Sequence, residues 1–490
     1  MTFRPFARHI DRNVHILRWL SVAAGLLLAA ACAVGPDYHR PKFDAAASYK
    51  EAGDWKPSEP NDAFSRGPWW EIYGDDALNQ LEVKIDISNE NVKAAAAAFD
   101  QSRALVAQAR AGFWPTVGAS AGVQRGGSPV TTLNAAGQPV TATRTQTTYN
   151  AGVSGNWTLD IWGQIRRSTE SSRASAQASA AALAAARLSA QAELAIDYFE
   201  LRAQDQLQKL LDDTVVAEQQ SLAITESRYR FGVAARADVV SAQAQLLSSQ
   251  AQQVNAKIQR AILEHAIAVL IGQQPASFTL SPSAMRTDVP TVPAGIPSTL
   301  LERRPDVAQA ERNVAAANAQ IGVAKAAYFP SLILSGSDDY TGSTWSHLFS
   351  LPNRIWSVGP QLAETLIDGG LRRAQVAAAR AFYEVSVDNY RQTVLTGFQQ
   401  VEDNIVTLRV LEQQAVIEDA AVAAAREAEK LTLNQYKAGT VPYSSVITAQ
   451  TTRLSAEQTA LSVLSSRLQT SVALIEAVGG GWNASQLPLP

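Results

Sequence analysis

The stretch RYRFGVAARADVVSAQ, residues 228–243, is written a second time as QYKAGTVPYSSVITAQ, residues 435–450. Each copy places a tyrosine three residues before a glycine and closes on a glutamine, and the offset is 207 positions (436 − 229). In each copy a short polar break precedes a helix-like run. Two such breaks in one chain indicate an internal duplication, in which each break is a turn between helices.

The duplication extends over most of the chain. ARAGFWPTVGASAG (109–122) matches AKAAYFPSLILSGS (324–337), and LDIWGQIRRS (159–168) matches TLIDGGLRRA (365–374). The first half holds about nine extra residues between these landmarks, in a Gly, Pro and Thr-rich segment (126–148) that we expect to be a loop. We therefore predict two structural repeats, 67–285 and 286–490, after a signal peptide (1–31) and an acylated N-terminal extension (32–66).

Long helices are predicted in each repeat. The 68 residues between Gly163 and Gly232 contain no proline or glycine, and the 68 between Gly370 and Gly439 contain only Gly397. A continuous helix of that length extends about 100 Å, which no compact domain needs. Alanine, leucine and valine among polar residues favour narrow coiled-coil seams. The first repeat reads as a helix (84–112), a β-hairpin (about 113–162), a long helix (164–231) and a helix (237–271). The second reads as a helix (302–327), a hairpin (about 329–368), a long helix (371–438), a helix (443–478) and a C-terminal tail.

The hairpins have the period of two that is typical of strands. In TYNAGVSGNWTL (148–159), apolar residues alternate with small polar ones, as in a membrane β-barrel. Trp356, Val358 and Leu362 continue this pattern in the second half, where Pro360 interrupts it. Aromatic residues near the strand ends favour a girdle at a membrane interface, and a soluble β-sandwich is the alternative. Since four strands cannot close a barrel, the chain is expected to oligomerise.

The N-terminus predicts export. Arginines between positions 4 and 18 precede an apolar run that ends in LLLAAAC, a charged, apolar and small-residue pattern of a signal peptide. Cys32, the only cysteine, stands where a bacterial lipobox would be acylated, with Ala29 in place of the usual leucine. Ordinary cleavage that removes Cys32 or leaves it free is the alternative. No later apolar run reaches the roughly 18 residues of a spanning helix.

Composition excludes several classes of function. The net charge of −3 gives no basic footprint for nucleic acid. The three histidines after Cys32 are scattered, so neither a metal site nor a catalytic pair is indicated, and His265 is expected to be a packing residue. No glycine-rich phosphate loop is present. The chain is predicted not to be an enzyme and to hold no cofactor apart from a lipid on Cys32.

The residues from Cys32 to about Gly480 resemble the TolC-like outer-membrane factors, specifically the OprM/NodT lipoprotein branch. CAVGPDYHRP (32–41) resembles the acylated start of that branch, and IPSTLLERRPDVAQAERNVAAANAQIGVAKAAYFPSL (296–332) is the most specific match. The resemblance implies an α+β fold in which a homotrimer joins twelve strands, four from each chain, into one outer-membrane β-barrel. The barrel would continue into a long periplasmic α-helical coiled-coil tunnel.

The same resemblance implies a passive exit duct for drugs or other small toxic compounds. A periplasmic adaptor and an inner-membrane pump of the RND type would be its partners, together with outer-membrane lipid. A periplasmic coiled-coil adaptor or structural lipoprotein is one alternative, and the exit channel of a type I secretion system is another. The transported compounds cannot be identified from the sequence.

In TolC-like proteins, polar bonds among residues at the periplasmic tip keep the tunnel closed. The positions of this chain that match the tip are Arg228, Tyr229, Gly232, Arg236, Asp238, Tyr436, Gly439, Tyr443, Ser445 and Thr448. The two glycines suit left-handed helix caps. We expect Asp238 and Arg236 to bond across the tip to Tyr436 or Tyr443. Gly163, Gly369 and Gly370 are similar to the strand-to-helix turns of the family.

Overall fold

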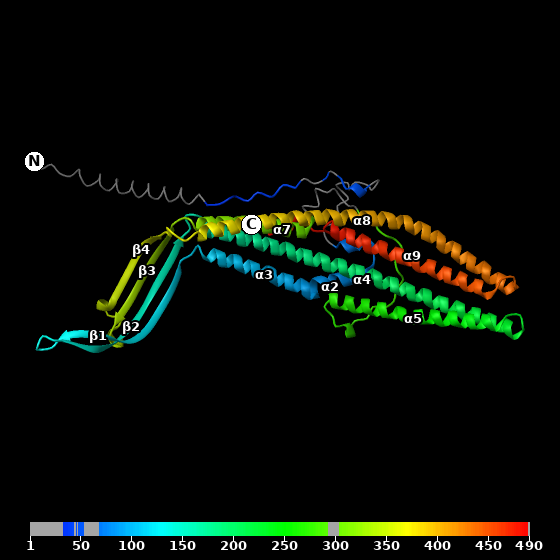
Figure 1. The fold of residues 1–490 in the computed structure, drawn as a ribbon, viewed down its shortest axis with the longest axis horizontal. Coiled ribbons are helices and arrows are strands. Elements are labelled where there is room, and N and C mark those ends of the chain that lie inside the picture. Colours follow the sequence, from blue (N-terminus) through cyan, green and yellow to red (C-terminus); the bar gives the residue numbers. More distant parts are fainter. Residues whose placement is uncertain (1–32, 44–45, 47, 53–67, 293–302, 489–490) are drawn as a thin grey trace, which may run out of the picture.

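The computed structural model describes residues 33–43, 46, 48–52, 68–292 and 303–488, and the structural statements below concern these residues. A β-sheet lies at one end of a long helical body, and the two helix-to-helix turns lie at the other end (Figure 1). The helices are α2 (Asp76–Ser88), α3 (Glu90–Ala111), α4 (Gln164–Arg230), α5 (Arg236–Leu270), α7 (Pro305–Ala326), α8 (Leu371–Ala438) and α9 (Tyr443–Ala477). The strands are β1 (Thr116–Leu133), β2 (Pro139–Leu159), β3 (Ser331–Gly342) and β4 (Arg354–Ala363).

The described helices form four parallel columns. α3 and α5 follow one another along the first side of α4, α7 and α9 follow one another between α4 and α8, and α8 forms the last column. The sheet has the order β1-β2-β3-β4, so each strand continues one column. Every neighbouring pair of strands is antiparallel. The chain is therefore one layer of helices continued by one layer of strands, with a free edge on each side.

Two glycines allow the end-to-end stacking within the columns. Gly272 follows α5 with a φ of +68°, and a Cβ there would lie 2.3 Å from the carbonyl oxygen of Ser88 in α2. Gly479 follows α9 with a φ of +94°, and its Cβ would lie 2.1 Å from the carbonyl oxygen of Arg303. The two glycines are 207 positions apart, as are the tip motifs. Only glycine fits both the left-handed conformation and the close backbone approach.

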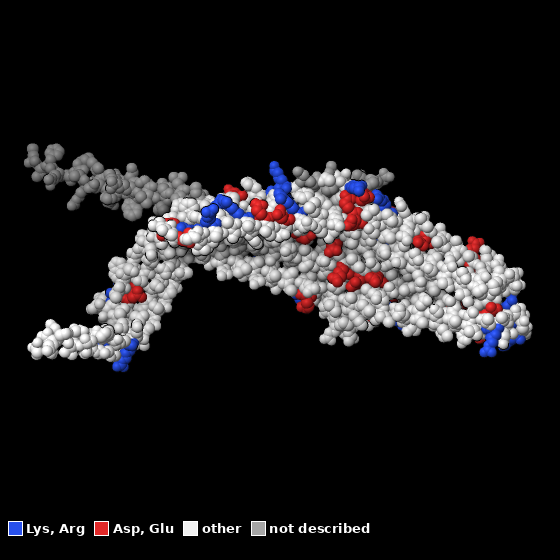
Figure 2. Space-filling view, viewed as in Figure 1, with Lys and Arg blue, Asp and Glu red and all other residues white. Residues whose placement is uncertain are grey.

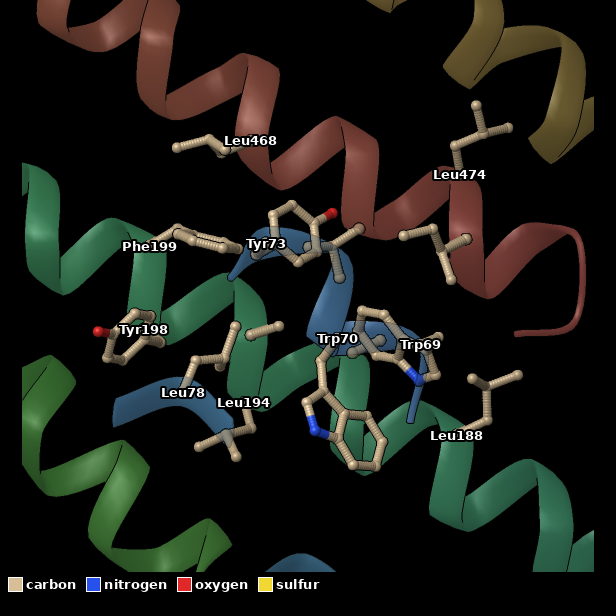
Figure 3. Packing of buried hydrophobic residues seen from close by; sticks show 14 of the residues in the cluster. Trp69, Trp70, Tyr73, Leu78, Leu188, Leu194, Tyr198, Phe199, Leu468 and Leu474 are labelled. Atoms are coloured by element: carbon tan, nitrogen blue, oxygen red, sulfur yellow. The ribbon is translucent and has the colours of Figure 1, made fainter. Parts of the chain in front are cut away.

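The hydrophobic core lies halfway along the helices, where the segment before α2 wraps the body. Trp69 and Tyr73 of the 3-10 helix η2 (Trp69–Tyr73) pack between α4 and α9, together with Tyr198 and Phe199 of α4 (Figure 3). Their polar atoms find partners: the Tyr73 hydroxyl bonds Ser471 Oγ at 2.7 Å, and the Tyr198 hydroxyl donates to Asp75 Oδ2 at 2.8 Å. This belt holds α2, α4, α5 and α9 together.

The helix predicted over 84–112 is wrong at its start. The structure has two helices, α2 and α3, with Asn89 between them in an extended conformation. The Asn89 side chain accepts from the backbone N–H of Val92 at 3.0 Å and donates to the Leu270 carbonyl at 2.7 Å. An N-cap that also holds the end of α5 favours the break over a continuous helix. The α7 helix likewise begins at Pro305, after Arg304, and residue 302 lies outside the described residues.

The loop predicted over 126–148 is also wrong. β1 and β2 continue through it as a paired ribbon, and only residues 134–138 form the turn. Asn134 Oδ1 accepts from the backbone of Ala136 and Gln138, and Gly137 has a φ of +77°. The Thr and Val content stabilises the extended ladder. Pro129 and Pro360 are tolerated because β1 and β4 are edge strands of the sheet in this chain.

Candidate functional site

The two turns at the tip have the backbone that their glycines predict. Gly439 caps α8 with a φ of +81°, and its N–H bonds the carbonyls of Gln435 and Tyr436. Gly232 follows the end of α4 with a φ of +71°. Pro442 stands at the N-cap of α9. The repeated motif thus builds the same helix reversal twice, at the end farthest from the sheet (Figure 1).

Two tyrosines form the core of the tip. Tyr436 at the end of α8 and Tyr443 at the start of α9 are 3% and 1% exposed, and their rings meet edge to face at 5.1 Å. Ala242 of α5 and Val446 of α9 complete this cluster. Burial raises the pKa of the Tyr443 hydroxyl to about 12, and the negative charges of Glu218 and Asp238 add to the shift. The Tyr443 phenol therefore stays protonated at neutral pH and can donate a hydrogen bond.

Arg228 joins the two turns. Its guanidinium lies over the ring of Tyr436, 4.9 Å from the centroid, and its Nη1 donates to the Lys437 carbonyl at 2.7 Å. A Cβ at Gly439 would lie 3.5 Å from Arg228 Nη2. A cation–π contact and a charge-assisted hydrogen bond from one side chain thus hold the end of α4 against the end of α8.

The bonds predicted from Asp238 and Arg236 to the tyrosines do not form within the described chain. The Tyr436 hydroxyl donates instead to Thr225 Oγ1 of α4 at 3.4 Å. Asp238 lies in the first turn of α5, where the positive end of the helix dipole stabilises its negative charge. Arg236 is exposed at the start of the same helix. Within one chain the Tyr436 hydroxyl thus has its partner on α4, although Ala242 of α5 also packs in the tyrosine cluster.

The remaining predicted tip residues make local contacts. Tyr229 is 45% exposed on the outer side of the first turn. The Ser445 N–H bonds the Pro442 carbonyl, and the Thr448 hydroxyl donates to the Ser444 carbonyl. Lys and Arg side chains gather at this end of the body (Figure 2), among them Arg228, Arg230, Arg236 and Lys437. The tip surface is basic around a buried tyrosine pair.

Polar residues behind the tyrosines were missed by the sequence analysis. The Gln450 amide donates to Ser221 Oγ at 3.1 Å, and Gln450 is 2% exposed. Glu218 accepts from Gln245 at 3.0 Å, and burial raises its pKa. The repetition of Gln243 and Gln450 in the opening motif was the available signal for Gln450. Glu218 and Ser221 sit inside a long polar helix, where sequence alone does not show which face is buried.

The strand-to-helix junctions form the second group of predicted residues. Gly163 has a φ of +81°, and Gly369 and Gly370 have φ values of +62° and +93°. Asp160 accepts from the N–H groups of Ile165 and Arg166, and so satisfies the start of α4. Asp368 bonds the N–H groups of Gly370 and Arg372 in the same way before α8. The glycines therefore make the turn from strand to helix, and an aspartate accepts from N–H groups at the start of each helix.

The N-terminal segment reaches the first junction. Cys32 lies outside the described residues, but the Val34 N–H donates to the Trp162 carbonyl at 3.0 Å. Residues 33–43, which we call the strap, then run along α7 and α8. Asp37 pairs with Arg167 at 2.8 Å, and Asn318 donates to the Pro36 carbonyl at 3.0 Å. The strap thus places residues 33 and 34, which follow Cys32 in the sequence, beside the junction between β2 and α4.

Two other expectations concern residues outside these groups. His265 is exposed on α5 in a single chain, so its predicted packing role stays a prediction. In the described part of the chain, no three His, Cys, Asp or Glu side chains group as metal ligands would. None of the described helices is both long and apolar enough to cross a membrane.

Comparison with known proteins gives matches to both repeats. The model of the family named outer membrane efflux protein matches residues 84–273 and 296–480. The probable efflux pump outer membrane protein TtgC of Pseudomonas putida is 29% identical over 467 residues, with 94% of this chain and 95% of the relative covered. Nodulation protein T of Rhizobium leguminosarum bv. viciae is 30% identical over 477 residues, with 96% and 95% covered.

Solved structures show the same architecture. The outer-membrane channel OprN superposes with a TM-score of 0.84 at 30% identity, covering 92% of this chain and 100% of that chain. The open state of the MtrE outer membrane channel of Neisseria gonorrhoeae has a TM-score of 0.80 at 25% identity, with 92% and 99% covered. The duplicated columns, the four-stranded sheet and these matches agree with the resemblance seen in the sequence: the chain belongs to the outer membrane efflux protein family.

Proposed function

We propose that this chain is the outer-membrane exit duct of an efflux pump, and that three copies form one continuous channel. The observation that carries the proposal is the two-faced sheet. In each strand, its register places several of the larger apolar residues on one face, among them Val117, Val153, Trp157, Leu334 and Val358. The other face carries small polar residues such as Ser120, Asn150, Ser154, Ser335 and Ser357.

This division suits a barrel wall with lipid outside and water inside. On the face shown in Figure 2, the sheet is mostly uncharged, with a few acidic and basic side chains among the white ones. From Leu332 to Tyr340 the strand β3 advances eight residues, about 26 Å at the usual rise. That length is close to the apolar band of about 25 Å in outer-membrane barrels. Aromatic side chains lie at both ends, such as Trp114 and Phe329 near the helices and Tyr149 and Tyr340 at the far end.

The free edges support a closed ring. Within the described chain, β1 and β4 each have one unpaired edge, and the α3–α5 column and α8 border the helical layer. Exposed apolar residues follow the outer side of α5 at heptad-like spacing: Val240, Leu247, Val254, Ile258, Ile262 and Val269. On the opposite edge, α8 exposes Val385, Leu395, Val410 and Leu431. Joining the first edge of one copy to the last edge of the next buries both in a cyclic assembly.

The proposed duct has twelve strands in its barrel, with the helical columns extending into the periplasm. The strap supports acylation of Cys32, because it brings residues 33 and 34 to the strand-to-helix junction at the membrane end. The basic tip at the opposite end would face the periplasmic adaptor and the inner-membrane pump. TtgC and several other relatives are named as outer membrane proteins of efflux pumps, which favours an efflux role over a purely structural one.

The tip residues are proposed to form the gate. Arg228, Tyr436 and Tyr443 hold the two turns of one chain together, so separating the turns would widen the tunnel end. Asp238, Arg236, Ser445 and Thr448 remain proposed gate residues that would act between chains. None of these four side chains is buried within a single chain, so each can contact a neighbouring chain at the tip.

Gel migration of the purified protein tests the assembly. Without heating, the sample should run at about three times the mass of one chain, and heating should convert it to the monomer. Deletion of the gene should sensitise cells to part of a panel of antibiotics, dyes and solvents. A monomer that does not change on heating would refute the duct. An intact trimer with unchanged sensitivity would retain the barrel but refute the efflux role.

A further inference from the structure

The connection between β3 and β4 is an ordered apolar element. It contains the 3-10 helices η4 (Trp345–His347) and η5 (Leu351–Asn353), and residues 341–353 carry no Asp, Glu, Lys or Arg. Leu348 is 0% exposed, and Asn353 Nδ2 donates to the His347 carbonyl at 2.8 Å. The segment thus has a small core and a fixed backbone. We call residues 341–353 the outer loop.

The outer loop exposes large apolar side chains. Trp345 is 62% exposed, Phe349 64% and Leu351 80%. Isolated apolar residues are common on protein surfaces, but three within seven residues of an uncharged segment form a patch. In water such a patch has an unfavourable hydration free energy. The interior of the loop is filled by Leu348, so these three side chains remain on its surface.

Ring contacts place the outer loop on one side of the sheet. Trp345 meets Tyr149 of β2 with centroids 6.0 Å apart, and Phe349 meets Tyr340 of β3 at 5.3 Å. The register puts Tyr149 and Tyr340 on the apolar face, in line with Val153 and Leu334. The loop patch is therefore continuous with the face that is proposed to contact lipid.

An ion pair lies on the strands next to this patch. Arg354 and Asp338 form a two-pronged ion pair on the same face, with both N–O distances at 2.8 Å. Trp356 lies beside Asp338 in the register and is 66% exposed. Arginine, tyrosine and tryptophan together are typical of the lipid headgroup level. The ion pair neutralises both charges.

From these contacts we infer that the outer loop is a lipid-binding collar: it lies in the outer leaflet of the membrane, with Trp345, Phe349 and Leu351 at the boundary between the headgroups and the acyl chains. The inference rests on the proposed function, since it needs the apolar face to contact lipid. In this position the loop thickens the apolar wall at the outer rim. An ordinary exterior loop would lie in water instead.

Site-directed fluorescence distinguishes these positions. Leu351→Cys and Phe349→Cys are labelled with an environment-sensitive fluorophore in the purified protein, which is then placed in phosphatidylcholine vesicles. Val358→Cys, on the apolar face of β4, reports on the barrel wall itself. Ala135→Cys, at the turn of the β1–β2 ribbon, is the water-exposed control. The unsubstituted chain measures any label on Cys32.

The labels are tested with a spin-labelled lipid and with aqueous iodide. We expect about a twofold loss of emission with the lipid quencher at Leu351→Cys and Phe349→Cys, as at Val358→Cys, and little effect of iodide. Ala135→Cys should show the reverse. Leu351 variants have no ring contact to lose, so their result stands even if Phe349→Cys disturbs the loop.

Three results would overturn the inference. Quenching of both loop labels by iodide alone would place the loop in water while Val358→Cys still confirms the barrel. Quenching by neither agent would show that a neighbouring chain covers the loop. If Val358→Cys also escapes the lipid quencher, the barrel orientation of the proposed function fails, and the collar fails with it.

Discussion

Replacing Arg228 by alanine should loosen the tip. The guanidinium makes a hydrogen bond of 2.7 Å to the Lys437 carbonyl and lies 4.9 Å from the Tyr436 centroid. A charged hydrogen bond contributes about 1.5–3 kcal/mol and a partly exposed cation–π contact about 0.5–1 kcal/mol. Because Arg228 is only half-buried, we expect the lower part of this range, about 2 kcal/mol in total. If the closed tip alone keeps both contacts, the open state gains roughly 30-fold in relative population.

Single-channel recording in planar bilayers measures this change as the fraction of time spent open. Arg228→Lys retains the charge but loses the planar fork, and should lie between the wild type and Arg228→Ala. Arg230→Ala is the matched control, because Arg230 is exposed two residues later in the same turn. Heat-modifiable migration on gels checks that each variant still assembles.

An open fraction in Arg228→Ala equal to that of Arg230→Ala would refute the role of Arg228 as the link between the turns. Equal open fractions in the Lys and Ala variants, both above the wild type, would show that the directional hydrogen bond matters and the charge does not. The tyrosine pair would then have to hold the tip without the arginine.

Three further predictions follow from the same structure. Gly479→Ala should lower the free energy of unfolding by about 3 kcal/mol or more, because its Cβ would lie 2.1 Å from a backbone oxygen. Gly232→Ala, with open space around it, should lower it by only about 1–2 kcal/mol. Thermal unfolding in detergent compares the two variants, and equal losses would contradict the close backbone approach at Gly479. Burial raises the pKa of Glu82 well above 4.5, so its contribution to stability is present at low pH and lost as the pH rises through the folded pKa. Glu82→Gln should therefore lose less stability than the wild type between about pH 5 and about pH 8, and the difference between their free energies of unfolding should grow by up to about 1.4 kcal/mol per unit of the Glu82 pKa shift. An unchanged pH slope would show that Glu82 does not contribute to it. Cys32→Ser should lose the mass of the proposed lipid in mass spectrometry and remain in the outer membrane fraction, and identical masses of the mature proteins apart from the substitution would rule out acylation.

Local signals in the sequence predicted the repeated elements well. The long runs without proline or glycine became α4 and α8, and the alternation in 148–159 became part of β2. Gly439 and Gly232 took the left-handed conformation expected from their place after a helix. These features depend on backbone preferences and periodicity, which a single sequence carries.

The missed features depend on contacts between distant segments. Asn89 ends α2 because the end of α5 lies against it, 181 positions away along the chain. Arg228 faces Tyr436 because α4 and α8 end at the same level, whereas the sequence suggested Asp238 through its resemblance to tip residues elsewhere. The ribbon over 126–148 was hidden by its glycines and prolines, which are ordinary signals of a loop.

The glycine junctions give the four columns unequal stiffness. α4 and α8 are unbroken rods from the sheet to the tip, whereas the other two columns are each divided at mid-length, beside Gly272 and Gly479. A bending load on the tip therefore concentrates at these two joints, and α5 and α9 can pivot there while the upper halves stay fixed. The belt around Trp69 and Tyr73 lies beside both joints, since Ile271 and Val478 are part of the same cluster, and it would act as the fulcrum of this movement. Opening of the periplasmic end should thus leave the barrel undisturbed, since the lever begins at the middle of the molecule.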